Sequence, residues 1–186
     1  MSPSKISSLC CVLALSASFL WAQAPVLRKS PELAITVPSG EQVLLSSFKN
    51  KVVVLEFMFV NSAHCIRLAQ MLGDLQGNLG ARGFQAIAVA FGPHADPALL
   101  GHVAERLQLT YPLGFVMASD ADAYLNRTGA EILKIPQLVV IDRKGAIRAS
   151  SGSRGDSSLE DEASLRPFLD NLLNEKPTTS GRQNQR

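Results

Sequence analysis

The sequence has few cysteines, few aromatic residues and almost no net charge. Of its 186 residues three are cysteine and 6% are aromatic, and 18 basic residues stand against 16 acidic ones, a formal net charge of +2. This balance gives no support for a nucleic-acid-binding surface, which needs an excess of clustered Lys and Arg. Cys10 and Cys11 lie close to the N-terminus, which leaves Cys65 alone in the rest of the chain. A lone cysteine cannot close a disulfide within its own chain.

The first 24 residues are typical of a signal peptide. Lys5 is their only charged residue, residues 10–21 are all apolar or small, and Ala22 or Ala24 could precede the cleavage site. The apolar run has about a dozen residues, fewer than the roughly 20 that cross a bilayer. We therefore predict an exported chain, periplasmic or secreted after cleavage, with no stable membrane span in its mature part.

The mature part is the size of one domain with one sizeable core. Removing Lys5 with the signal peptide leaves 17 basic residues against 16 acidic ones. The end of the chain is polar and carries no apolar residue after Pro177, which is typical of disorder. We predict a signal peptide over residues 1–24, a single domain over 25–174 and a disordered polar tail over 175–186.

Several segments are predicted to be strands. The core strands are apolar runs without polar alternation, as in strands buried on both faces, and turn residues separate the remaining, shorter ones. The predicted core strands are 51–60, 84–91 and 137–141, and the turn 142–145 connects the last of these to a strand over 146–149. The predicted N-terminal hairpin pairs 33–37 with 42–45, and a further short strand is predicted over 113–117.

Helical patterns alternate with these strands. Apolar residues from Cys65 to Leu79 recur at spacings of three and four, which predicts one face of a helix. Asp96 followed by Pro97 predicts a helix start, with the helix running to about Leu107. Further helices are predicted over 119–126 and 160–174. The order predicts an α/β fold, with a central mixed β-sheet flanked by helices and preceded by a β-hairpin.

The segment Ser62-Ala63-His64-Cys65 lies at the step from a predicted strand to a predicted helix. A helix N-terminus offers unpaired N–H groups and a positive dipole end, which together stabilise a thiolate. Cys65 is therefore either a reactive thiol, favoured by the dipole and by His64, or a buried, unreactive residue at the head of the apolar stripe. Both interpretations stay open at this stage.

The order and spacing of several short segments resemble those of redoxins, the AhpC/TSA-type thioredoxin-like proteins, and especially exported thiol-disulfide oxidoreductases. The resemblance runs from about residue 33 to residue 173. The segments that carry it are Gly40 to Leu45, residues 48–51, VVVLEFMF at 52–59, the S-A-H-C turn, Gly83 to Gln85, Ile135-Pro136 and VVIDRKG at 139–145. This resemblance implies a thioredoxin-like fold.

The resemblance also assigns roles to individual residues. It places Ser62 where the family has the first, nucleophilic cysteine of Cys-x-x-Cys, and Cys65 where the family has the second, with His64 before it as in C-P-H-C motifs. It matches Pro136 to the family's cis-proline, which with Ile135 would bind the substrate backbone. A peroxidase is disfavoured, because the peroxidatic cysteine corresponds to Ser62 and the Pro-x-x-x-Thr pattern is missing.

Two functions remain open on this basis. The chain is either a monothiol oxidoreductase that acts through Cys65 on protein or small-molecule thiols and disulfides, or a redox-inactive module that holds extended peptide at the cis-proline face. Neither function needs a cofactor. A hydrolase is disfavoured. A serine without an adjacent base is a poor nucleophile, and no acid near Ser62 and His64 in the sequence completes a Ser-His-acid pattern.

Two other features of the sequence bear on the site. The three histidines, His64, His94 and His102, lack metal-ligand spacing, so we predict no metal site. Glu56 interrupts the apolar run 51–60, which packing alone does not explain. It either reaches a sheet edge or is a buried acid near the motif that handles protons.

Overall fold

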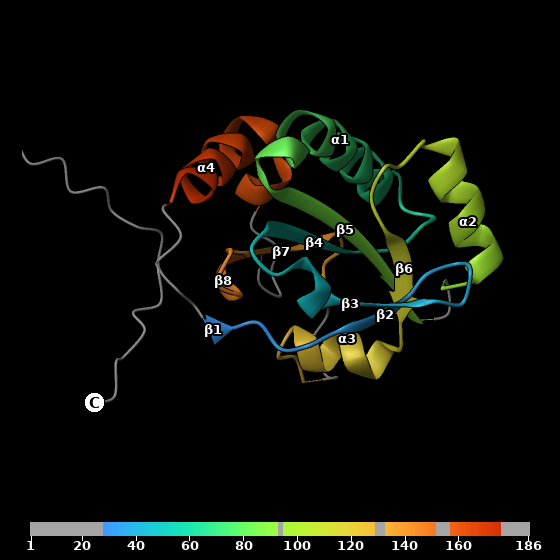
Figure 1. Ribbon diagram of the computed structural model, residues 1–186. Helices are drawn as coiled ribbons and strands as arrows, with labels where there is room; N and C mark the ends of the chain where they lie inside the picture. Colours follow the sequence, from blue (N-terminus) through green and yellow to red (C-terminus); the bar gives the residue numbers. More distant parts are fainter. Residues whose placement is uncertain (1–27, 93–94, 129–132, 152–156, 176–186) are drawn as a thin grey trace, which may run out of the picture.

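The computed structural model describes residues 28–92, 95–128, 133–151 and 157–175 (Figure 1). The predicted signal peptide, nearly all of the predicted tail, and His94 lie outside these ranges.

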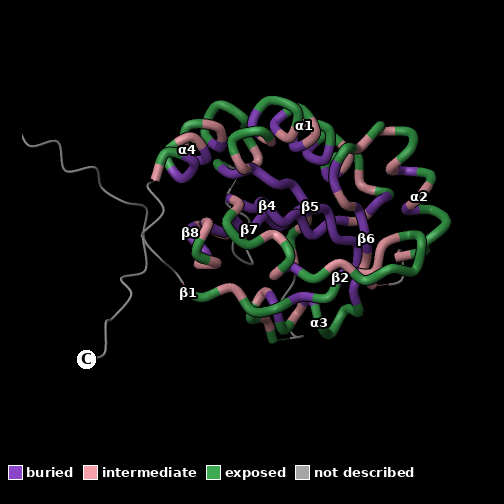
Figure 2. Tube along the Cα trace, viewed as in Figure 1, coloured by how far each residue is buried: buried purple, intermediate pink, exposed green. Residues whose placement is uncertain are grey.

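Within the described ranges the strands form one eight-stranded mixed sheet in the order β1-β8-β7-β4-β5-β6-β2-β3. The strands are β1 (Arg28–Lys29), β2 (Ala34–Thr36), β3 (Gln42–Leu44), β4 (Val52–Met58), β5 (Phe84–Phe91), β6 (Leu113–Val116), β7 (Gln137–Ile141) and β8 (Ala146–Ser150). Strand β4 lies in the middle, parallel to β5 and antiparallel to β7. Every residue of β4, β5 and β7 is buried (Figure 2).

Helices cover both faces of the sheet. They are α1 (Ala63–Leu79), α2 (Pro97–Arg106), α3 (Ala118–Tyr124) and α4 (Glu162–Asn174), with the short 3₁₀ helices η1 (Leu45–Phe48), η2 (Gly80–Arg82) and η4 (Ser157–Glu160). Helices α1 and α4 lie side by side on one face, α3 lies on the other, and α2 lies beyond β6 (Figure 1).

Alternate residues of β4 point to opposite faces of the sheet, as the two-residue period of a strand requires. Val54 and Met58 join the apolar cluster beneath α1 and α4, whereas Leu55 and Phe57 join the cluster that includes residues of α3. Glu56 lies between Val54 and Met58 in this alternation. Its carboxyl group is therefore directed to the α1 face, which also holds Cys65.

The predicted α/β fold, its mixed sheet and its N-terminal hairpin are confirmed, since β2 pairs antiparallel with β3. The last helix begins later than predicted, because η4 ends at Glu160 and Asp161 then precedes the first turn of α4. Strand β1 was not predicted, because its two residues, Arg28 and Lys29, are polar. It forms through its pairing with Ile147 and Ala146 of β8.

Candidate functional site at the start of helix α1

The candidate motif occupies the sharp turn between β4 and α1. Ser62 is the N-cap of α1, with φ −90° and ψ 117°, and its Oγ accepts a hydrogen bond of 3.4 Å from the backbone N–H of Cys65. Serine is a favoured N-cap because its oxygen satisfies an N–H group that the first helical turn leaves unpaired. The Ser62 side chain is thus held at the positive end of the helix dipole.

Cys65 lies in the first turn of α1 and is fully buried, with 0% of its surface exposed. It belongs to the apolar cluster that also contains Leu68 and Leu72. Burial raises the pKa of its thiol, and a hydrogen bond with the Ser62 side chain offsets this only in part. The thiol is therefore protonated at neutral pH and shielded from solvent, whereas thiol-disulfide exchange needs an accessible thiolate.

Glu56 is a buried acid in the centre of the sheet, because β4 lies between β5 and β7. This placement excludes the alternative in which its side chain reaches a sheet edge. Among the described residues, no group donates a hydrogen bond to either of its carboxylate oxygens. Burial raises the pKa of Glu56 well above its ordinary value, and the negative charge of Glu160 raises it further.

The carboxyl group of Glu56 affects the pKa values of two other residues, Cys65 and Tyr111. Its negative charge adds to the effect of burial in raising the pKa values of Cys65 and Tyr111. The Tyr111 hydroxyl donates a hydrogen bond of 2.8 Å to the carbonyl of Ala69 in α1. The carboxyl group of Glu56, the thiol of Cys65 and the phenol of Tyr111 thus share a largely apolar interior on the α1 face.

His64 contacts an acidic residue that the sequence did not suggest. Its Nε2 lies 2.9 Å from Oε2 of Glu160 at the end of η4, and 46% of the His64 side chain is exposed against 10% of that of Glu160. The expectation that no acid accompanies His64 holds only for its sequence neighbourhood, because folding brings η4 to α1. No hydrogen bond among the described residues joins Ser62 to His64, so the three do not form a nucleophilic relay.

The Ile135–Pro136 peptide bond is cis, as predicted. Strand β7 begins at the next residue, Gln137, which pairs with Phe57 of β4. The antiparallel register therefore places Ile135 and Pro136 beside the end of β4, immediately before the turn that leads to Ser62. Within the described ranges, neither the N–H nor the carbonyl of Ile135 has a hydrogen-bond partner.

The described residues include no cluster of three or more potential metal ligands. His102 lies on α2 and is exposed, and His64 is paired with Glu160. None of the helices in these ranges has both the length and the apolar character needed to cross a membrane.

Solved structures of similar fold include several thiol-disulfide proteins. A thiol:disulfide interchange protein of the thioredoxin family from Chlorobium tepidum superposes with a TM-score of 0.65 and 18% identity over 82% of this chain and 99% of that one. A thiol:disulfide interchange protein from Bacteroides sp. superposes with a TM-score of 0.63 and 18% identity, over 88% of this chain and 99% of that one. A candidate protein disulfide isomerase from Bacteroides thetaiotaomicron superposes with a TM-score of 0.63 and 27% identity, over 82% of this chain and 92% of that one.

Among curated proteins, no relative matches the chain in a sequence search. The model of the AhpC/TSA family matches residues 26–150, which include β1 to β8 and the Ser62–Cys65 motif. The order of the sheet, the helices on both faces and the solved structures of similar fold agree with this match. The chain therefore belongs to the AhpC/TSA family and has a thioredoxin-like fold.

Proposed function

We propose that this protein binds extended polypeptide at its cis-proline face and does not exchange electrons through Cys65. The observation that carries the proposal is the complete burial of Cys65, the one cysteine in the described residues. Ser62 replaces the exposed nucleophile at the helix start, and a hydroxyl without an adjacent base does not attack a disulfide. The fold keeps its binding face while the residue that starts exchange is absent.

The backbone beside the motif supports peptide binding. Among the described residues, the N–H and the carbonyl of Ile135 have no hydrogen-bond partner, so they resemble the free edge of a strand, to which an extended peptide can add by main-chain hydrogen bonds. Apolar side chains lie at the same end of the sheet. The rings of Phe59 and Phe91 are in contact at 5.0 Å between centroids, and Met117, which follows β6, is 68% exposed. These groups would contact the side chains of a bound peptide.

We predict that a cysteine-free, unstructured peptide with alternating apolar residues binds this face. In a titration of ¹⁵N-labelled protein, we expect amide shifts at Ile135 and Phe59, and none at Lys49, at the opposite end of the sheet. Met117→Gln should weaken binding about fivefold, since it removes an apolar contact. The matched control is Leu99→Gln on α2, whose side chain is 43% exposed. Unchanged amides at Ile135 and Phe59 would refute the proposal.

Monothiol exchange through Cys65 is the second candidate. It is favoured by the position of the thiol in the first turn of α1 and by its hydrogen bond with the Ser62 side chain, because both stabilise a thiolate. In this case the thiolate of Cys65 would attack a disulfide of its partner, which forms a mixed disulfide and releases the partner's other sulfur as a thiol. A second thiol, from the partner or from a small molecule, would then have to resolve that disulfide.

Alkylation of Cys65 distinguishes these two functions. In the mature chain at pH 7.5, we expect iodoacetamide to modify native Cys65 at least about a hundredfold more slowly than the same residue in urea, because the native thiol is buried and protonated. Mass spectrometry measures both rates, with Cys65→Ala as the control for other sites. Rapid modification of the native protein would favour the monothiol oxidoreductase.

We further propose that the protein acts outside the cytoplasm. This rests on the composition of the first 24 residues, a short apolar run that follows Lys5 and precedes Ala22 and Ala24. N-terminal sequencing of the mature protein would show Gln23 or Pro25 as the first residue if this is correct, and Met1 if it is not.

A further inference from the structure

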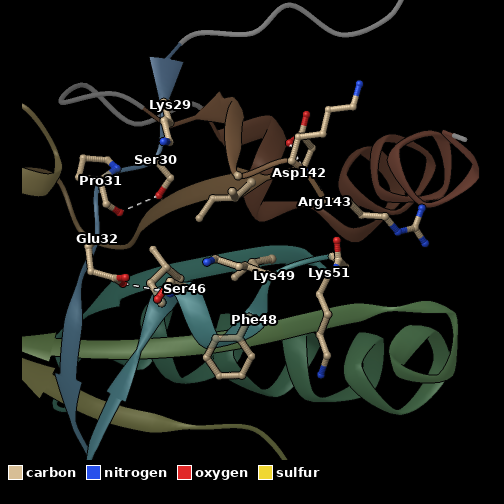
Figure 3. Close-up of a pocket in the computed structure, with 16 residues that line it drawn as sticks. Lys29, Ser30, Pro31, Glu32, Ser46, Phe48, Lys49, Lys51, Asp142 and Arg143 are labelled. Atoms are coloured by element: carbon tan, nitrogen blue, oxygen red, sulfur yellow. Dashed lines mark hydrogen bonds between the residues drawn. The ribbon is translucent and has the colours of Figure 1, made fainter. Parts of the chain in front are cut away.

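A cavity of about 870 Å³ lies at the end of the sheet opposite the candidate site (Figure 3). Its walls are formed by residues from three segments: 29–32 at the end of β1 and after it, 45–51 around η1, and 141–145 at the turn between β7 and β8. These residues surround the first residues of β4, whereas the Ser62–Cys65 motif follows its last. The volume is within the roughly 300–1,000 Å³ of typical small-molecule sites.

The cavity wall carries an excess of positive charge. Five cationic residues line it, Lys29, Lys49, Lys51, Arg143 and Lys144, against two acidic residues, Glu32 and Asp142. An excess of this size on a concave surface favours an anionic ligand over a cationic one, because the low-dielectric walls concentrate the field.

The two acidic residues are occupied by other partners. Asp142 accepts backbone hydrogen bonds of 2.9 Å from Lys144 and Ala146, and its second oxygen lies 3.0 Å from the guanidinium of Arg148. Glu32 accepts hydrogen bonds of 3.0 Å from the backbone N–H groups of Leu33 and Ser46. Neither carboxylate lies within ion-pair distance of a lysine in the cavity wall, so neither neutralises one directly.

The cationic residues divide into two groups. Lys51 donates to Oε1 of Gln85 at 2.8 Å, and Arg143 donates to carbonyls at the end of α4, including that of Leu173 at 2.7 Å. In Figure 3 both point away from the centre of the cavity, whereas Lys49 lies across it. Within the described ranges, the ammonium groups of Lys49, Lys29 and Lys144 have no carboxylate within 4 Å and no hydrogen-bond acceptor.

The rest of the wall is partly apolar. The ring of Phe48 and the side chains of Leu45 and Pro31 line the cavity, and Figure 3 shows the Phe48 ring beneath Lys49. Apolar walls combined with a small number of placed polar groups are typical of sites for organic ligands.

We propose that this cavity binds a small organic anion, one that carries a carboxylate or phosphate group on an apolar body. The ammonium group of Lys49 binds the anionic group, and Lys29 and Lys144, which also line the cavity, add to the attraction. The apolar body packs against Phe48 and Leu45. This site is separate from the cis-proline face and does not depend on the function proposed for it.

Phenyl phosphate and benzoate, the two probes of this chemistry, distinguish a phosphate ligand from a carboxylate ligand. In titrations of ¹⁵N-labelled full chain at 50 mM salt, we expect at least one of them to shift the amides of Ser46, Lys49 and Lys144. Lys49→Gln should weaken the binding about tenfold, as loss of a charge-assisted contact does. Lys144→Gln should weaken it less, and Arg67→Gln, which removes an exposed charge on α1, should leave the affinity unchanged.

Two further ligands test the parts of the proposal separately. Inorganic phosphate should bind more weakly than phenyl phosphate because it has no apolar body, and benzyl alcohol should not bind because it has no charge. The proposal is overturned if neither phenyl phosphate nor benzoate shifts the amides of Ser46, Lys49 and Lys144 when it is present at 10 mM. The proposal is also overturned if Lys49→Gln and Arg67→Gln bind the anionic probe with equal affinity. Binding of benzyl alcohol as tight as that of the anions would overturn it as well.

Discussion

Ser62→Cys is expected to install dithiol chemistry in a protein that lacks it. The new sulfur would occupy the N-cap of α1, where the Ser62 oxygen now accepts the N–H of Cys65, and the helix start lowers the pKa of a thiol there. Cys-x-x-Cys spacing across the first turn brings two sulfurs within disulfide reach. Cys65 would act as the resolving thiol, a role that tolerates its burial.

Reduction of a model protein disulfide, with dithiothreitol as the electron source, measures this gain. We expect Ser62→Cys to exceed the wild-type rate by about two orders of magnitude, because a serine cannot form the mixed disulfide. The control Ser62→Cys/Cys65→Ala should keep the nucleophile but lose turnover. If Ser62→Cys is folded yet forms no internal disulfide, the match of Ser62 to the family's first cysteine is wrong.

Glu56 is expected to make the protein less stable as pH rises. Its pKa is raised in the folded state, so above its unfolded pKa of about 4.3 the folded chain holds a proton that the unfolded chain has released. The free energy of unfolding therefore falls between that pH and the raised pKa, by up to about 1.4 kcal/mol per pH unit. Below pH 4.3 both states are protonated and this loss is absent.

Glu56→Gln removes the titration and keeps a side chain of the same size. In urea unfolding, we expect the wild type to lose stability relative to Glu56→Gln as the pH rises from 5 to 7, by up to about 1.4 kcal/mol per pH unit. Comparing the two pH values cancels any constant cost of burying the amide. Glu105→Gln on α2, which removes an exposed carboxylate, should follow the wild type at both pH values. Parallel pH profiles for wild type and Glu56→Gln would show that the pKa of Glu56 is not raised.

The core elements could be predicted because their signals are local. The apolar run at residues 84–91 became β5 with the same bounds, and the apolar stripe from Cys65 to Leu79 became the buried face of α1. Asp96 and Pro97 marked the start of α2. Strand β1 escaped prediction because two polar residues carry no periodicity, and the strand exists only through its pairing with β8.

In the candidate site, too, the features with a local signal could be predicted and those that depend on distant segments could not. The place of Ser62 at the helix start and the cis bond before Pro136 followed from residue type, spacing and family resemblance. The pairing of His64 with Glu160, residues 96 positions apart, could not be predicted, because no local pattern links η4 to α1. The cavity around Lys49 likewise draws its wall from three distant segments.

The sequence by itself determined the layered α/β fold and the absence of a second cysteine from the motif, because hydrophobic periodicity and residue identity are properties of the chain. It left two questions open: whether Cys65 is reactive, and whether Glu56 lies at an edge or inside. Only the tertiary structure placed both side chains in the interior, with Glu56 beneath α1 and Cys65 on the buried face of α1. Burial and the charges nearby set the pKa of an acid or a thiol, and both depend on which segments fold against each other.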